Sequence, residues 1–438
     1  MIATAARSLC IATVLTALAA AAPSRWGGDP FAAATAANAL RQTSSAFAAG
    51  NNPSLLAVES EPAFGIGVAT TRFGWNGLGN VVVDSPAFRV EDGRLRRAEV
   101  TPPETLVTEM LVGIRVPIRS TVRWLPPMGI GVAASGPLST LRQFRASSPY
   151  DFAPLRYGTS DAQFKANVGV SAALTPRFFL GAGLDVFVTA AGNAEVAVGG
   201  QEPVGRFAMD VGWNTAAVFG AFWNGDATTA GLTYRQRIAP RLRQEFVGAI
   251  ALGGADVAAL PLALEATLYG EPETFELEVG RRLGRFTFAA GLRWERWNGL
   301  STSALAVRAR LPEGKVRRTG SGDVRFRDTL SPAASVTFAA SERWNVSGGY
   351  RWSPSPMVDY SGPANVIDLG THVVGLGVSQ RLDSGAILPC PIRWSVAVQR
   401  HFAEAVSVTK TRADAVGAPG YRLSGGGFGV HAGLELAL

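Results

Sequence analysis

The chain has 438 residues and a formal net charge of +7, and only 17% of its residues are charged while 50 are glycine. The arginines are spread singly over many segments and are not interleaved with stacking aromatic residues, which argues against a nucleic-acid partner. Hydrophobic residues make up 47% of the chain, yet beyond the N-terminus no stretch of about 18 residues is both apolar and uncharged, which argues against membrane-spanning helices.

The N-terminus, residues 1–21, has the pattern of a secretion signal. Arg7 supplies a positive charge, Leu9 to Leu18 form an apolar stretch, and the small residues Ala19 to Ala22 provide a cleavage site. An uncleaved anchor is the alternative, but the apolar stretch is short for spanning a bilayer. The mature chain then keeps one cysteine, Cys390, so we expect neither a disulfide framework nor a thiolate metal site.

Residues 22–61 predict a small helical segment that precedes the main body of the protein. Asp29 followed by Pro30 is typical of a helix N-cap with proline at the first helical position. The alanine-rich stretch from Phe31 to Gln42 favours a short helix. A turn signature follows, formed by Asn52, Pro53 and Ser54.

Residues 62–438 alternate between bulky apolar and small or polar side chains. From Phe428 to Leu438 every even position is apolar, and the odd positions hold small or polar residues. Successive side chains of a strand point to opposite faces, so the segment has one apolar and one polar face. Charges fall mainly on the face opposite the apolar one, which a helical period would not produce.

We count fourteen to sixteen such segments, including weaker ones at 258–269, 274–283 and 303–311. The predicted fold is all-β: a transmembrane antiparallel β-barrel of about 14 strands, since bacterial barrels close with an even number, with residues 22–61 as a hatch in its lumen. A secreted β-sandwich or β-helix is the alternative, but its outer face would be polar. Aromatic residues gather at segment ends, as an interfacial girdle requires: Trp75, Tyr234, Trp297, Trp344, Tyr350, Trp352 and Trp394.

A resemblance to a known family lies between Asp328 and Leu382, which read DTLSPAASVTFAASERWNVSGGYRWSPSPMVDYSGPANVIDLGTHVVGLGVSQRL. This resembles the late strands of the FadL/TodX (OMPP1) family, with an Asp-Thr start, a Gly-Tyr strand, a Ser-Pro loop and Thr-His before a glycine-rich strand. The GLTYR sequence that ends at Arg235 is similar to the family's Gly-Leu-Ser-Tyr-Arg strand. Asn52-Pro53-Ser54 resembles its Asn-Pro-Ala hatch motif, with Ser54 as a departure, and Leu438 stands where the family commonly has an aromatic residue.

The resemblance implies a monomeric channel in the cell outer membrane of a Gram-negative bacterium. It implies passive uptake of long-chain fatty acids or other hydrophobic molecules through loop capture, binding in the lumen, hatch rearrangement and lateral exit. The partners implied are a fatty acid or hydrocarbon, together with outer-membrane lipid and lipopolysaccharide; no cofactor or metal is implied. A structural or adhesive barrel without selective transport is the alternative.

In each predicted strand, every second side chain should point into the lumen, and these inward side chains give the candidate ligand site. Such side chains would line a pocket for an acyl chain, and inward arginines would meet a carboxylate. The alternative is that these arginines pair with Glu109, Asp185 or Glu295 and only fill the barrel. The candidates are Val107, Leu111, Phe187, Arg235, Arg293 and Trp297.

No enzyme is predicted, because the three histidines, His372, His401 and His431, stand in no nucleophile or metal motif. A lipid hydrolase that pairs a serine with His372 or His401 is the enzymatic alternative. The glycines of residues 129–134 mimic a dinucleotide fingerprint but run into a strand, so they have a mechanical role instead. The candidate positions for a strand kink are Gly129, Gly131 and Pro137.

Overall fold

The computed structural model describes most of the chain from Asp29 to Leu438. The described residues are 29–36, 45–83, 95–118, 125–138, 152–157, 164–198, 204–238, 241–252, 255–256, 260–267, 271–300, 306–310, 316–319, 324–362, 365–384 and 390–438. The predicted signal peptide, residues 1–21, lies outside them, as do residues 22–28 and 37–44 of the predicted hatch.

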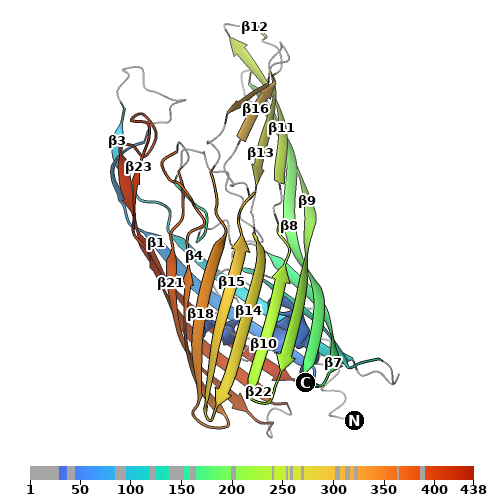
Figure 1. Ribbon diagram of the computed structural model, residues 1–438. Helices are drawn as coiled ribbons and strands as arrows, with labels where there is room; N and C mark the ends of the chain where they lie inside the picture. Colours follow the sequence, from blue (N-terminus) through green and yellow to red (C-terminus); the bar gives the residue numbers. More distant parts are fainter. Residues whose placement is uncertain are drawn as a thin grey trace.

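Fourteen of the described strands form a closed antiparallel barrel (Figure 1). Each pairs with the next around the wall, and the last closes onto the first from Ala63↔Ala437 to Trp75↔Gly425. The predicted fold class is confirmed. The wall strands are β1 (Ala63–Trp75), β4 (Thr105–Ile118), β5 (Met128–Pro137), β7 (Lys165–Thr175), β8 (Phe178–Val198), β9 (Val204–Asn224), β10 (Thr228–Arg235), β14 (Glu273–Leu283), β15 (Phe286–Arg296), β18 (Thr329–Ala339), β19 (Trp344–Ser353), β21 (Thr371–Leu382), β22 (Ile392–Ala403) and β25 (Gly425–Ala437).

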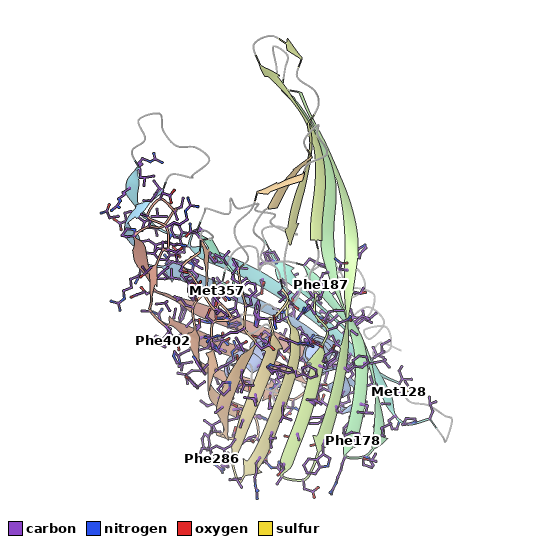
Figure 2. The ribbon with its side chains drawn as sticks, turned by 45° about the horizontal axis from the view of Figure 1, so that its top comes forward. Met128, Phe178, Phe187, Phe286, Met357 and Phe402 are labelled. Carbon is purple, nitrogen blue, oxygen red and sulfur yellow. The ribbon has the colours of Figure 1, made fainter. Side chains whose placement is uncertain are left out.

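The predicted alternation of faces is confirmed in the wall. In β1, Ile66 and Val68 are 37% and 39% exposed on the outside, while Ala69 is buried. Phe286 and Phe402, 45% and 49% exposed, project from the outer surface in Figure 2. An outward apolar band on a closed barrel suits contact with lipid, because barrel closure leaves no unpaired strand edge in the wall.

Aromatic side chains form a row across the outer face of four neighbouring strands. Ring centroids are 6.2 Å apart from Phe219 to Tyr234, 4.8 Å from Tyr234 to Phe275 and 5.4 Å from Phe275 to Trp294. The girdle prediction is wrong for Trp75 and Trp297, which are 5% and 1% exposed. Trp75 is the last residue of β1, and Trp297 directly follows β15. Both lie at the end of the barrel that carries the long connections, where loop residues cover them.

The two ends of the barrel differ. The end with Ala63 and Ala437, here called the turn side, carries connections as short as Thr175–Phe178 between β7 and β8. The opposite end, here called the loop side, carries long connections with strands of their own (Figure 1). These are β2 (Leu78–Val82), β3 (Arg97–Val100), β6 (Ala153–Pro154), β20 (Val366–Ile367), β23 (Val406–Thr409) and β24 (Gly420–Leu423).

A sheet extends beyond the wall on the loop side, next to the upper parts of β8 and β9 (Figure 1). It corrects one expectation: the segments 258–269 and 303–311 form strands of this extension and do not join the wall, whereas 274–283 does. Their alternation is a property of any half-buried strand, so sequence periodicity alone did not separate the two positions. The extension contains β11 (Arg241–Leu252), β12 (Ala255–Asp256), β13 (Leu260–Thr267), β16 (Ala306–Arg310) and β17 (Val316–Thr319).

The described residues before the wall form four short helical turns. They are α2 (Pro30–Ala33), η1 (Ser45–Phe47), α3 (Ala48–Asn51) and η2 (Pro53–Ala57). The Asp29 carboxylate accepts a hydrogen bond from the Phe31 N–H, as the predicted cap requires. The helix expected as far as Gln42 is shorter than predicted: α2 ends at Ala33, and Ala36 has a φ of 54°, which a right-handed helix cannot contain. None of the described helices is long and apolar enough to cross a membrane.

Candidate functional site

Residues 29–36 and 45–61, here called the inner segment, lie inside the barrel against the inward face of the wall. The approach is so close that wall positions facing the segment have no room for a side chain. A Cβ atom on Gly220 would lie 1.9 Å from Asn52 Oδ1, and one on Gly129 would lie 2.0 Å from the Leu56 carbonyl oxygen. The wall glycines with a Cβ position within 3.1 Å of the inner segment are Gly65, Gly67, Gly113, Gly129, Gly131, Gly169, Gly181, Gly220, Gly349, Gly375, Gly377 and Gly433.

The motif that resembles the family's hatch motif joins the inner segment to the wall. Asn52 Oδ1 accepts hydrogen bonds from the N–H (3.0 Å) and the hydroxyl (2.6 Å) of Ser54. Its Nδ2 donates to the carbonyl of Leu232 in β10 over 3.2 Å. Pro53 is the first residue of η2, so Asn52 caps this helix and binds the wall with the same amide.

Arg235, a candidate for carboxylate binding, is already paired within the barrel. Its Nη1 lies 2.8 Å from Asp185 Oδ2, and its Nη2 donates to the carbonyls of Gly50 and Asn51, the latter over 2.6 Å. One guanidinium therefore connects the wall strands β8 and β10 to the inner segment. The sequence left open that inward arginines pair with Glu109, Asp185 or Glu295 and only fill the barrel, and Arg235 does pair with Asp185.

Three further contacts hold the inner segment, and sequence reasoning missed them. Arg115, 1% exposed in β4, donates to the carbonyls of Glu59 and Glu61. Gln399 donates from its amide to the Ala33 carbonyl over 2.8 Å. The guanidinium of Arg393 lies 4.4 Å from the ring centroid of Phe31. Inward parity was the only sequence signal for these residues, because their partners are remote in the chain.

The apolar candidates Val107 and Leu111 both face inward from β4. Leu111 is 2% exposed and packs with Ala69 and with Phe31 and Phe47 of the inner segment. Val107 is 6% exposed and lies four residues further toward the loop side. Leu111 thus contacts the inner segment, and Val107 lies on the loop side of that contact.

Phe187 is 1% exposed and packs with Ala216 and Ile238 (Figure 2). The ammonium of Lys165 lies 4.8 Å from its ring centroid and 3.1 Å from Asp185 Oδ2. Because Asp185 also binds Arg235, the structure brings Phe187 and Arg235 together around one carboxylate.

Arg293 and Trp297 belong to a group on β15 and the residue that follows it. Arg293 Nη2 lies 2.9 Å from Glu276 Oε2. The indole of Trp297 donates to Glu295 over 3.2 Å, and its ring lies 6.0 Å from that of Phe326. The six candidates therefore form three groups: a β4 group against the inner segment, the Phe187 group and the Glu295 group.

Arg351 of β19 is a buried inward arginine that sequence reasoning did not select. It is 8% exposed, and its Nε has no hydrogen-bond partner among the described residues. No described carboxylate forms a salt bridge with it, but Glu276 and Glu295 act on it as opposite charges from a longer distance, and Arg293 acts on it as a like charge. A buried guanidinium that forms no ion pair with a described residue is an available binding group for an anion.

His401 and His431 are fully buried on inward faces, and the ring of Tyr157 lies 5.9 Å from that of His401. His372, in contrast, faces outward, where its Nδ1 is 2.7 Å from the Tyr350 hydroxyl and its Nε2 is 3.2 Å from Glu404. Among the described residues, no group of three or more His, Cys, Asp or Glu side chains is arranged to hold a metal ion.

The candidate kink residues lie in a ladder with a regular register. β5 pairs with β4 from Met128 to Pro137 without a register shift. Gly129 and Gly131 instead allow η2 to approach the wall: a Cβ on Gly131 would lie 2.4 Å from Leu56 Cδ2. Close backbone approach is a common reason for glycine in a strand, and the kink stays a prediction.

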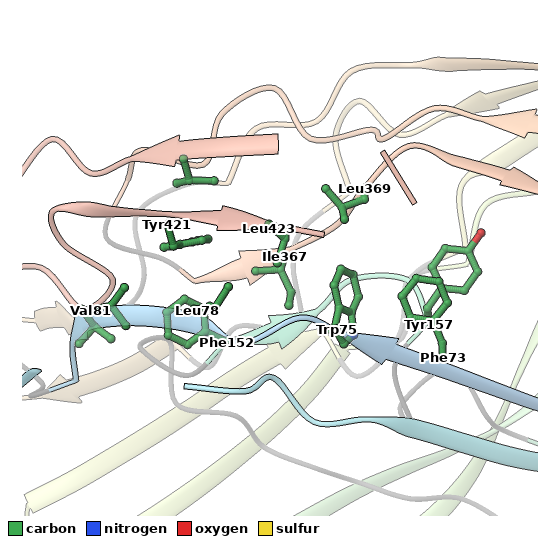
Figure 3. Packing of buried hydrophobic residues seen from close by; sticks show 12 residues of the cluster. Phe73, Trp75, Leu78, Val81, Phe152, Tyr157, Ile367, Leu369, Tyr421 and Leu423 are labelled. Atoms are coloured by element: carbon green, nitrogen blue, oxygen red, sulfur yellow. The ribbon is translucent and has the colours of Figure 1, made fainter. Parts of the chain in front are cut away.

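A cluster of apolar side chains closes over the loop side of β1, as Figure 3 shows. The ring centroids of Phe73 and Trp75 lie 5.0 Å apart, and the cluster joins the end of β1 to residues from four different connections between wall strands. Here called the loop cluster, it consists of Phe73, Trp75, Leu78, Val81, Phe152, Tyr157, Ile367, Leu369, Val408, Val416, Tyr421 and Leu423.

Comparison with known proteins gives matches in structure alone. No family model matches the sequence, and no curated protein matches it either. A FadL homologue from Pseudomonas aeruginosa is similar with a TM-score of 0.60 at 16% identity, over 93% of this chain and 98% of that one. The toluene transporter TodX of P. putida is similar with a TM-score of 0.56 at 13% identity, over 94% and 99%. The toluene transporter TbuX of Ralstonia pickettii gives a TM-score of 0.52 at 12% identity, over 94% and 98%. The chain has the fold of these channels, and the resemblance to the FadL/TodX family is confirmed at the level of the fold.

Proposed function

We propose that the protein is an outer-membrane channel of a Gram-negative bacterium for passive uptake of hydrophobic molecules. The observation that carries the proposal is the inner segment, which occupies the interior of a closed barrel and contacts inward glycines on nine of its strands. A barrel of about fourteen strands is too wide for its own side chains to fill. An inner segment in that space closes a straight aqueous path and leaves transport to a selective one.

The domains follow from this proposal. Residues 1–21 are the cleaved signal, residues 22–61 the hatch, and residues 62–438 the barrel, which acts as a monomer among outer-membrane lipid and lipopolysaccharide. The apolar outer face and the secretion signal support the location. The named relatives in structure are a FadL homologue and two toluene transporters, which supports transport over catalysis.

Long-chain fatty acids are the proposed substrate class. Phe187 with Ala216 and Ile238 offers an apolar contact for the acyl chain, with Val107 and Trp297 on the way to it. Arg351 meets the carboxylate in place of Arg235 and Arg293, because those two are paired with Asp185 and Glu276. Release follows rearrangement of the hatch and lateral exit through the wall.

Deletion of residues 24–58 tests the role of the inner segment. The deletion should raise single-channel conductance in a planar bilayer and abolish selective uptake of a radiolabelled long-chain fatty acid by cells. Heat-modifiable migration on a gel checks that the barrel still folds. If conductance and uptake match those of the intact protein, the inner segment does not gate transport.

A second measurement separates transport from the alternative of a structural or adhesive barrel. The purified protein is denatured and extracted, and the extract is analysed by mass spectrometry for fatty acids and hydrocarbons. A transporter should carry such a ligand and raise uptake above that of cells lacking the protein. Equal uptake by both kinds of cell favours the structural role.

A further inference from the structure

Residues 152–157 lie inside the mouth of the barrel, although they belong to the connection between β5 and β7. The ring of Tyr157 stacks on that of Phe73 of β1, with centroids 4.6 Å apart and planes 8° apart (Figure 3). Its carbonyl accepts a hydrogen bond from the Thr105 hydroxyl of β4 over 2.7 Å. His401 of β22 meets its ring edge-on at 5.9 Å. These three wall residues are inward and at most 1% exposed, so Tyr157 lies between inward faces of the wall.

Arg156 holds this segment to the connection between β19 and β21. Its Nε and Nη2 each lie 2.8 Å from one carboxylate oxygen of Asp368, and Nη2 also donates to the Leu369 carbonyl over 2.8 Å. Nη1 donates to the Ser353 hydroxyl over 3.1 Å. Asp368 is fully buried, so this bidentate pair is a strong contact that is costly to leave half-made.

The backbone of the segment is not part of the strand ladder of the wall. Its strand β6 pairs in parallel with β20, through Ala153 and Pro154 opposite Val366 and Ile367. Tyr157 has a φ of 63°, a left-handed conformation that persists in a non-glycine residue only where contacts impose it. The segment can therefore leave the mouth without breaking a wall ladder, and the loss of its contacts relieves the strain at Tyr157.

Tyr360 supports the pair from the other side. Its hydroxyl donates to the Asp368 carbonyl. Burial and the neighbouring Asp368 carboxylate raise the pKa of Tyr360 to about 12, so the donated proton is retained at neutral pH. The closed arrangement is thus fully hydrogen-bonded under physiological conditions.

We propose that residues 152–157 are a gate on the loop side, closed by the Arg156–Asp368 ion pair and the stacking of Tyr157 on Phe73. A ligand that enters from the loop side must displace this gate before it reaches the inner segment. The role of the gate in uptake rests on the proposed function. Whether the gate controls access of a reagent to the lumen can be tested independently of that function.

The test measures that access with a reporter cysteine. In a Cys390→Ser background, Thr71→Cys places a thiol on the inward face of β1, between Phe73 and Ala69, which contacts the inner segment. Thr71 is 3% exposed. A membrane-impermeant maleimide applied to intact cells reports how fast reagent from outside reaches it. Asp368→Asn, which leaves Arg156 buried without its anion, should speed labelling at least tenfold.

Asp383→Asn is the matched control, since it removes a carboxylate from the solvent-exposed Arg343–Asp383 pair; it should leave the rate unchanged. Tyr157→Ala opens the mouth without stranding a buried charge and should also accelerate labelling, which covers the case that Asp368→Asn fails to fold. Unchanged labelling in the folded gate variants, or equal acceleration in the control, overturns the gate. Faster labelling in a protein that takes up no fatty acid retains the gate and rejects the proposed function.

Discussion

The turn-side and loop-side halves of the lumen are filled in different ways. Toward the turn side, the inner segment packs against wall glycines, as where Gly220 faces Asn52, and polar wall residues such as Arg235 donate to its backbone carbonyls. Toward the loop side, large aromatic residues and a buried ion pair do the same work, as where Tyr157 stacks on Phe73 and Arg156 binds Asp368. Packing against glycines depends on shape at short range, and the loop-side contacts depend on charge and ring stacking.

This difference predicts how each half will open. Close packing of backbone against backbone is sensitive to a single added atom, because a Cβ–oxygen separation near 2 Å is far inside van der Waals contact. An ion pair is sensitive to the loss of one charge. Substitutions that add volume should therefore act most on the turn-side half, whereas loss of charge should act on both halves, through Arg235 on the turn side and through the Arg156–Asp368 pair on the loop side.

The largest effect is expected for Gly220→Val. The added side chain must displace Asn52, and overpacking of this kind costs about 1–3 kcal/mol or more. Single-channel conductance should rise toward that of the deletion of residues 24–58. Gly74→Val is the control, because nothing lies within 4 Å of a Cβ at that position. Equal conductance in both variants would show that the close packing does not hold the inner segment.

Arg235→Ala should give the next largest effect, because this residue connects Asp185 to the Gly50 and Asn51 carbonyls. Loss of hydrogen bonds to a charged group costs about 1.5–3 kcal/mol. The inner segment should become more sensitive to limited proteolysis while the barrel remains intact. Arg177→Ala, which removes an exposed pair with Asp226, should leave the digestion pattern unchanged.

Asn52→Ala removes the cap of η2 and the hydrogen bond to Leu232. A lost N-cap costs about 0.5–2 kcal/mol, so conductance should rise less than in Gly220→Val. Asn52→Asp keeps the accepting oxygen and loses the donor, which separates the two contacts. If Asn52→Asp behaves like the wild type, the cap matters and the bond to the wall does not.

The last substitution should leave the inner segment in place and change only ligand binding in the loop-side half. Arg351→Gln should weaken binding of a long-chain fatty acid about tenfold, since a charge-assisted hydrogen bond contributes about 1.5–3 kcal/mol. Toluene, which has no charge, should bind unchanged. Arg343→Gln, at an exposed pair with Asp383, is the control. Tryptophan fluorescence titration measures each affinity, and a parallel loss for both ligands would contradict a carboxylate role.

Much of the wall was predictable because alternation is a local property. The exposures of Ile66 and Val68 follow the parity read from β1, and lipid outside the barrel selects large apolar residues at those positions. Parity also placed Leu111, Phe187 and Arg235 on the inward face. Parity did not separate the extension strands from the wall strands, because it does not specify which strand each one pairs with. It also did not show that loop residues bury Trp75, which the sequence placed in the girdle.

The sequence by itself determined the strands, their faces and the cap at Asp29, since each depends on residues a few positions apart. Only the tertiary structure decided what the inward residues touch. Arg156 and Asp368 are 212 residues apart in the chain, and Gln399 and Ala33 are 366 apart. Barrel closure brings such residues together, and an arginine or a glycine has no local feature that names its partner. The wall is thus a consequence of periodicity, and the filling of its lumen is a consequence of closure.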